Sequence, residues 1–69
     1  MDSKLLGKKI KLARVERDLT QTQLAQKIKA LQKSISHYET GVSVPSLESL
    51  IKIARVLKKP ASYFLDELV

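Results

Sequence analysis

Residues 23–36, QLAQKIKALQKSIS, decide how this chain folds. The stretch has no glycine or proline, and its apolar residues Leu24, Ile28, Leu31 and Ile35 are separated by four, three and four positions. A single helix with a coiled-coil seam shows this spacing, and periodicity alone favours it. The alternative is two short helices that meet at a turn, and the choice determines which side chains the chain presents to a partner.

A strong helix start lies just before this stretch. Thr20 followed three residues later by Gln23 is the pattern of a capping box, and Leu19 and Leu24 have the positions of a hydrophobic staple. A helix is therefore expected to begin at Gln21. The sequence predicts that its inner face consists of Leu24, Ala25 and Ile28.

Another helix is predicted upstream of this start. Asp2 and Ser3 can each cap it. It is expected to stop near Asp18, because aspartate tolerates left-handed backbone better than most residues. Residues spaced four and three apart form its buried stripe, which is Leu6, Ile10 and Ala13.

Two further helices are predicted downstream. Gly41 ends the helix before them, Ser46 can cap the first of the two, and Pro60 prevents its continuation. The expected core face of this helix is Leu47, Leu50, Ile51, Ala54 and Leu57. A last short helix over about residues 61–68 carries Tyr63, Phe64, Leu65 and Leu68.

Composition limits the classes of function. Sixty-nine residues make one small domain, expected to span 1–69, with room for a core but hardly for a deep substrate pocket. Thirteen Lys and Arg against seven Asp and Glu give a net charge of +6, which favours nucleic acid first and acidic membrane surfaces second. The absence of cysteine excludes disulfides, and Lys52 and Arg55 interrupt the longest apolar region. The sequence predicts an all-α, cytoplasmic protein without a membrane span.

Catalytic chemistry has little support in the residue types. One histidine and no cysteine cannot build a usual zinc site, and neither glycine lies in a phosphate-cradling pattern. His37 has no nearby acid that would complete a triad. We therefore expect no enzymatic activity, no metal and no cofactor.

Residues 19–41, LTQTQLAQKIKALQKSISHYETG, resemble the helix-turn-helix of the Cro/CI-type phage repressors, the XRE family. The residues that carry the resemblance are Gln21 at the helix start, the small Ala25, the apolar Ile35, and the ending Tyr38, Glu39 and Gly41. LGKKIKLARVERDLTQ and VPSLESLIKIARVLKKPASYFL extend it over about residues 6–65. The resemblance implies a compact five-helix lambda-repressor-like DNA-binding domain, with the helix-turn-helix at about 20–40 and the recognition helix at about 32–40.

The chain departs from this family at the turn. Lys29 stands where the family usually has glycine, and Leu31 stands where it usually has a capping serine or threonine. A lysine in left-handed backbone costs about 1–2 kcal/mol, and a missing N-cap costs about 1 kcal/mol. An unbroken helix over residues 20–40 would measure about 30 Å, the width of a small domain. We therefore expect two helices, with the turn near Lys29 to Leu31.

The second of these helices has two different sides. Leu31, Ile35 and Tyr38 fall on one side, so Leu31 is expected in the core rather than against a thymine methyl group. The outward side consists of Gln32, Lys33, Ser36, His37 and Thr40. Glutamine can bond adenine through two atoms, lysine can reach guanine or phosphate, and serine and histidine can meet base edges. An ordinary solvated face has similar residues, and this is the alternative interpretation.

The resemblance assigns these residues to DNA contacts. Those at base-contacting positions are Gln32, Lys33, Ser36 and His37. Gln21 and Ser34 match positions that bind phosphate in the family. Lys29 and Thr40 are expected to contact phosphate as well, and Lys27 and Lys33 could supply further cations. The loop after Gly41 has no charged side chain, although its amides could face phosphate.

The resemblance also implies that Arg14 and Glu39 pair across the domain as a structural ion pair. Separate solvation of the two side chains is the alternative.

The sequence therefore predicts sequence-specific binding of double-stranded DNA by a transcriptional regulator, in particular a repressor. A homodimer on an inverted-repeat operator is expected, because one small module makes few base contacts. The predicted dimer interface is Tyr63, Leu68, Val69, Ile53 and Val56, whereas Phe64 is expected to complete the core. The alternative is an adaptor or antirepressor that uses the same fold to bind proteins. A complete chain of this kind would resemble a stand-alone Cro-like repressor or a restriction-modification controller.

Overall fold

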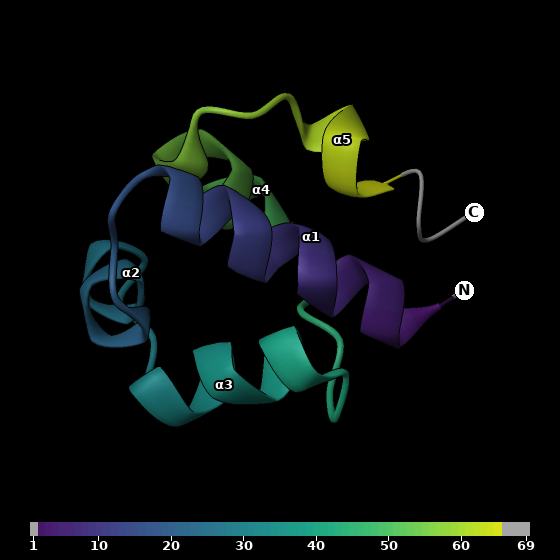
Figure 1. The fold of residues 1–69 in the computed structure, drawn as a ribbon, viewed down its shortest axis with the longest axis horizontal. Coiled ribbons are helices and arrows are strands. Elements are labelled where there is room, and N and C mark those ends of the chain that lie inside the picture. The colour runs from purple at the N-terminus through teal and green to yellow at the C-terminus, as the bar shows by residue number, and fades with distance from the viewer. Residues whose placement is uncertain (1, 66–69) are drawn as a thin grey trace.

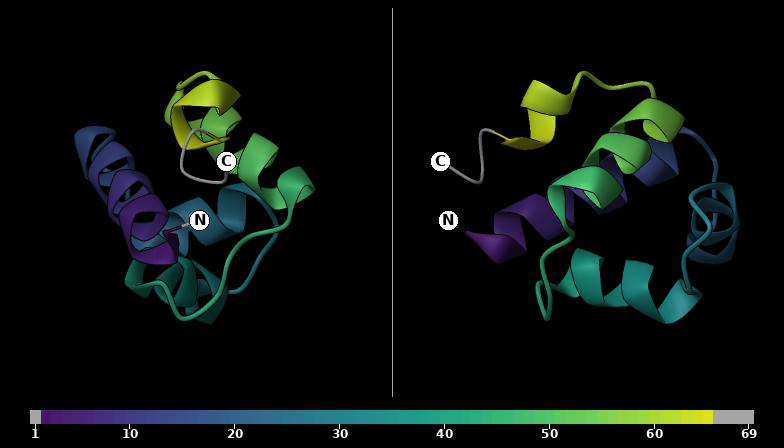
Figure 2. Two further views of the ribbon diagram at one scale, coloured as in Figure 1. Left: turned by 90° about the vertical axis from the view of Figure 1, so that its right-hand side faces the viewer. Right: turned by 180° about the vertical axis from the view of Figure 1, so that it is seen from behind.

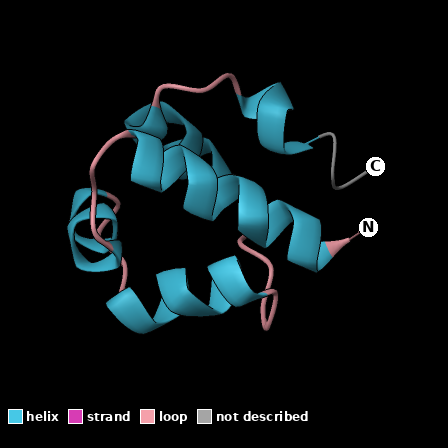
Figure 3. Ribbon diagram, viewed as in Figure 1, coloured by secondary structure: helices cyan, strands magenta, loops and turns pink. Residues whose placement is uncertain are grey.

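Five α-helices make up the part of the chain that the computed structural model describes, residues 2–65 (Figure 1). They are α1 (Ser3–Glu16), α2 (Gln21–Lys27), α3 (Gln32–Thr40), α4 (Leu47–Leu57) and α5 (Ala61–Leu65). Only loops and turns connect them over this range (Figure 3). The predicted all-α, five-helix fold is confirmed.

Residues 23–36 belong to two helices rather than one. The chain leaves α2 after Lys27, and Lys29 adopts left-handed backbone with φ of 57°. Leu31 is the N-cap of α3 but makes no side-chain capping hydrogen bond. In Figure 1, α2 is viewed nearly along its axis whereas α3 lies across the view. The turn therefore forms at the predicted place, without glycine and without a capping side chain.

The predicted helix starts have capping hydrogen bonds. At α2, the Gln23 backbone N–H donates to Thr20 Oγ1 over 3.0 Å, and the Thr20 N–H donates to Gln23 Oε1 over 2.8 Å. Asp2 accepts from two backbone N–H groups at the start of α1. Ser46 accepts from Ser49 at the start of α4. The side-chain caps of α2 and α4 offset, in the stability of the whole domain, the missing cap of α3.

One hydrophobic core lies between the helices. Its buried members are Leu6, Ile10, Ala13, Leu24, Ala25, Ile28, Ile35, Leu50, Ile53, Ala54, Leu57 and Phe64. The side and back views show α1 and α4 crossing this core, with α2 and α3 closing two of its sides (Figure 2). Phe64 is fully buried, as expected, and it attaches α5 to the other helices.

The predicted core face of α4 was partly wrong. Leu47 is 58% exposed and Ile51 is 39% exposed, whereas Ile53 is completely buried. The inner face is centred on residues 50, 53, 54 and 57, a spacing of three, one and three that turns Ile51 aside. Ile53 is therefore not available for the dimer interface predicted for it.

Leu31 also lies in a different place from the one predicted. It is 73% exposed rather than buried with Ile35 and Tyr38. As N-cap it has extended backbone, with φ of −87° and ψ of 146°, so the angular spacing of a helix does not apply to its side chain.

Gly7 allows α1 and α3 to touch backbone to backbone. A Cβ atom at this position would lie 2.5 Å from the backbone oxygens of both Tyr38 and Glu39. Glycine in the middle of a helix costs about 0.5–1 kcal/mol relative to alanine. It is required here because any side chain would push α1 away from the end of α3.

Two further residues of the predicted dimer interface, Tyr63 and Val56, are partly buried and pack against the core. Tyr63 packs edge-on against Phe64 with ring centroids 5.0 Å apart, and Lys9 and Lys59 place their ammonium groups 4.8 and 4.9 Å from its ring centroid. Val56 is half-buried against the core. Leu68 and Val69 lie outside the described residues.

Within residues 2–65, no helix has the length and apolar content needed to cross a bilayer.

Candidate nucleic-acid interface

The outward side of α3 is a polar surface at the edge of the molecule. Gln32 and Lys33 are exposed at its first turn, and Ser36 and His37 are partly exposed one turn later. Figures 1 and 2 show no other helix on the side of α3 that faces away from α1. The four residues predicted to contact bases therefore lie together on one open face.

A chain of hydrogen bonds connects this face to the interior. Gln32 Nε2 donates to Gln21 Oε1 over 2.6 Å, although the two side chains belong to different helices of the turn. Gln21 Nε2 in turn donates to Glu39 Oε1 over 3.0 Å. Each glutamine is thus restricted to one orientation, and the exposed end of α3 is fixed relative to α2.

The inner end of this chain is the ion pair of Arg14 and Glu39. Arg14 Nε lies 2.6 Å from Glu39 Oε2, and Arg14 Nη2 lies 3.0 Å from Glu39 Oε1. Arg14 Nη1 also donates to the Leu19 carbonyl over 2.7 Å. The pair is present, as the resemblance implied, and its two residues are 9% and 8% exposed. It connects α1, the α1–α2 loop and the end of α3 through one guanidinium.

The environment of Arg14 favours its charged form. The hydrogen bond to the Glu39 carboxylate raises the pKa of the guanidinium, burial opposes that effect, and the Glu39 charge adds to it. No buried side-chain nitrogen or oxygen lacks a hydrogen-bond partner among the described residues. The pair is therefore a fully satisfied buried contact, which is the condition under which such pairs hold a fold together.

The residues predicted to contact phosphate differ in whether their side chains already make hydrogen bonds within the protein. Lys29 is exposed at the turn, and Ser34 is partly exposed in the first turn of α3. The Gln21 amide is occupied by its bonds to two other side chains, so a phosphate would meet the backbone N–H groups at the start of α2. The Thr40 hydroxyl donates back to the Ser36 carbonyl over 3.0 Å.

The loop between α3 and α4 offers fewer amides than expected. The backbone N–H groups of Val42 and Ser43 both donate to the His37 carbonyl, over 2.9 and 3.2 Å, and that of Gly41 donates to Tyr38. These bonds complete the end of α3, where Gly41 has φ of 80°. The amides at the start of this loop are therefore not free to meet phosphate.

Three features of the structure were missed by sequence reasoning. They are the Gln21–Gln32 bond, the close approach at Gly7 and the buried position of Ile53. An isolated glycine within a helical pattern was the available signal for the close approach at Gly7.

Among the described residues, no three His, Cys, Asp or Glu side chains are grouped so that they could hold a metal ion.

A compact set of helices that presents a polar second helix after a tight turn defines the helix-turn-helix class of DNA-binding regulators. Residues 10–64 match the family model HTH_3, described as helix-turn-helix. The chain belongs to this family, the XRE-type helix-turn-helix proteins.

Solved and curated proteins are also similar to this chain. The structure is similar to SinR, a master regulator for biofilm formation solved in complex with DNA, with a TM-score of 0.81, 28% identity, and coverage of 87% of this chain and 97% of that one. Over 52 residues, 75% of this chain, the sequence is 40% identical to multiprotein-bridging factor 1 of Candida albicans and 42% identical to multiprotein-bridging factor 1a of Arabidopsis thaliana. The match spans 34% and 37% of the length of those two proteins.

Proposed function

We propose that this chain binds duplex DNA sequence-specifically, with α3 in the major groove, and acts as a transcriptional repressor. The observation that supports this most directly is the Gln21–Gln32 hydrogen bond of 2.6 Å on an otherwise open face. It holds an exposed amide in one orientation, and a fixed amide is what recognition of a base edge requires. SinR, which has the same fold, was solved with DNA bound.

The four side chains on the outward face of α3 have distinct roles in this proposal. Gln32 bonds adenine through its carbonyl oxygen and its remaining N–H. Lys33 donates to guanine, and Ser36 and His37 contact base edges one turn further along the helix. Each good two-atom contact provides about 1–3 kcal/mol of discrimination against a wrong base.

Backbone contacts fix the position of the domain on the duplex. Lys29 and Ser34 bind phosphate with their side chains, Gln21 with the N-terminal end of α2, and Thr40 after its hydroxyl leaves the Ser36 carbonyl. Each neutralised phosphate lowers log K by about 0.9 per tenfold rise in salt. Because the loop after α3 has no charged side chain, affinity is modest. The cations that do meet phosphate, among them Lys29, make this affinity fall steeply with salt.

The active species in this proposal is a cytoplasmic homodimer on an inverted repeat, with residues 1–69 acting as one DNA-binding domain. Two modules related by a two-fold axis double the small number of base contacts. Ile53 is buried, so the described residues that are left from the predicted interface are Val56 and Tyr63, which are both partly buried.

Selection from random duplex DNA at two salt concentrations tests this function. The wild-type chain is expected to enrich a short inverted repeat, and Gln32→Ala combined with Lys33→Ala is expected to abolish the enrichment. Gln26→Ala with Lys11→Ala is a matched control, because both residues are exposed and lie outside α3. Recovery of no motif by the folded wild-type chain would contradict sequence-specific binding.

A protein-binding adaptor is the second candidate. It is favoured by the similarity to proteins that are named multiprotein-bridging factors. An adaptor that used the α3 face for a protein partner would enrich no motif from random duplex DNA, so the selection described above separates the two functions.

A further inference from the structure

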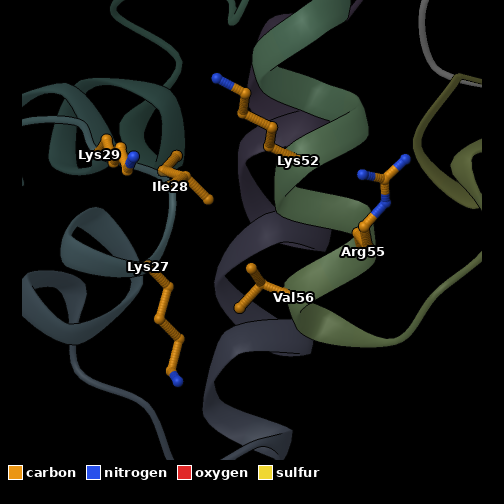
Figure 4. Close-up of a pocket in the computed structure, with 6 residues that line it drawn as sticks. All are labelled: Lys27, Ile28, Lys29, Lys52, Arg55 and Val56. Atoms are coloured by element: carbon orange, nitrogen blue, oxygen red, sulfur yellow. The ribbon is translucent and has the colours of Figure 1, made fainter.

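A cleft lies between the end of α2 and the outer side of α4 (Figure 4). It encloses about 300 Å³ and is lined by Lys27, Ile28, Lys29, Lys52, Arg55 and Val56. In the close-up, Ile28 and Val56 point into the space from opposite walls. The cleft therefore has an apolar floor with cationic side chains around it.

A second hollow continues the cleft along α4. It is lined by Leu47, Glu48, Ile51, Lys52 and Arg55, so it shares two of its residues with the first. Leu47 and Ile51 are 58% and 39% exposed. We call the two hollows together the α2–α4 groove. It adds two exposed aliphatic side chains to the apolar floor.

The walls of the groove carry an excess of positive charge. Lys27, Lys29, Lys52 and Arg55 line it, and Glu48 is the only acidic residue among the described residues that do so. Glu48 lies 3.5 Å from Lys52, in a pair whose side chains are 82% and 49% exposed. Such an exposed pair is weak. The groove thus combines uncompensated positive charge with an apolar surface.

The geometry points to an acidic, apolar segment of a partner protein as the ligand of the α2–α4 groove. Its aliphatic or aromatic side chains pack on Leu47, Ile51 and the floor, and its carboxylates face the surrounding cations. This proposal does not depend on base recognition, because no residue of the outward face of α3 takes part, and it shares only Lys29 with the phosphate contacts proposed above.

Charge argues against a second copy of the chain as the occupant. A two-fold axis through the groove would bring the same four cations of each copy together, in a chain whose net charge is already +6. Like charges brought together across an interface oppose association. An acidic partner removes this repulsion.

The position of the groove distinguishes it from the proposed base-contacting face of α3. In the back view of Figure 2, α4 lies toward the viewer with α2 beside it, while α3 lies along a different edge. Phosphate groups would gain nothing from the exposed Leu47 and Ile51, whereas an amphipathic peptide would bury both. One molecule could therefore hold bases on α3 and an acidic segment in the groove, with Lys29 the one residue that both the groove and the proposed phosphate contacts would use.

The test uses a synthetic peptide in which aspartates alternate with leucine and phenylalanine, titrated into the isotope-labelled chain. Amide chemical shifts are expected to move at residues 27–29 and 47–56 and to remain unchanged at 32–37. Two control peptides, with aspartates changed to asparagines or with apolar residues changed to serines, are each expected to bind more weakly. Absence of binding by the first peptide, or shifts centred on α3, would overturn the proposal.

Paired variants separate the groove from general charge attraction. Lys52→Glu with Arg55→Glu is expected to weaken peptide binding about tenfold. Lys8→Glu with Lys11→Glu makes the same change in net charge at exposed positions of α1 and is expected to have a much smaller effect. Ile51→Ser is expected to weaken binding, whereas Leu12→Ser, at a residue 60% exposed on α1, is not. An equal loss from both charge-reversal pairs would overturn the proposal.

Two further measurements address the other occupants. Sedimentation of the free chain would favour a second copy in the groove if it showed a dimer that Ile51→Ser dissociates. Duplex DNA affinity would place the groove on the DNA surface if Lys52→Glu with Arg55→Glu reduced it much more than the α1 pair does. Either result would overturn the proposal. A sedimentation profile that Ile51→Ser leaves unchanged, together with a DNA affinity that Lys52→Glu with Arg55→Glu reduces no more than the α1 pair does, would support it.

Discussion

The side chains of Gln21 and Gln32 are joined by a hydrogen bond of 2.6 Å, although one residue begins α2 and the other begins α3. The bond uses one of the two N–H groups of Gln32 and leaves its carbonyl oxygen and second N–H on the exposed side. These two atoms match the pair that adenine offers in the major groove.

Gln21→Ala is therefore expected to weaken binding to the selected DNA site about two- to thirteenfold, since a hydrogen bond of this kind contributes about 0.5–1.5 kcal/mol. The preference for adenine at one position should relax as well, because Gln32 is no longer oriented. Competition binding with single-base variants of the site measures both effects. Gln26→Ala, an exposed glutamine of the same helix, is expected to change neither. Unaltered base preference in Gln21→Ala would show that the bond does not orient Gln32.

Separating Arg14 from Glu39 is expected to destabilise the domain strongly. Arg14→Met or Glu39→Gln should each lower the free energy of unfolding by about 3–5 kcal/mol, because the remaining partner is buried without compensation. Arg14→Met with Glu39→Met should lower it by much less than the sum of the two single changes. Urea unfolding measures all three, and additive losses would contradict a direct coupling.

Replacing Lys29 by glycine is expected to stabilise the chain by about 1 kcal/mol, because only the lysine has a Cβ atom that strains the left-handed backbone at φ of 57°. Gln26→Gly, at an exposed helical position, should destabilise it by about 1 kcal/mol. Thermal unfolding of both variants is the measurement. A Lys29→Gly variant less stable than the wild type would show that the lysine has a stabilising contact at the turn.

Gly7→Ala tests two opposing effects at one position. Helix propensity alone would favour alanine by about 1 kcal/mol. The added Cβ would lie 2.5 Å from two backbone oxygens of α3, however, so we expect a net destabilisation of about 1–3 kcal/mol. Lys8→Ala, on the exposed side of α1, should change the free energy of unfolding by less than about 0.5 kcal/mol. A stabilised Gly7→Ala variant would mean that α1 can move away from α3.

Helix number, order and most boundaries could be predicted because their signals are local. The Thr20–Gln23 capping box, Gly41 and Pro60 each act within a few residues of the chain. Lys29 shows the limit of this approach. Nothing local marks it as a turn, and only the resemblance to a family placed a helix end there.

Most of the failures came from relations between helices. Ile51 and Ile53 are equally apolar, and which of them is buried depends on how α4 is rotated against the other helices. Leu31 fits the helical spacing of the core residues, but its extended backbone removes it from that pattern. The bond between Gln21 and Gln32 depends on the angle at the turn, which no spacing of residues encodes.

The contact at Gly7 has a consequence for how α3 meets any ligand. With α1 resting on its last carbonyl groups and Glu39 held by Arg14, this helix loses its conformational entropy during folding and not upon association. Complex formation then needs no ordering step, so its rate should depend on diffusion and long-range charge attraction.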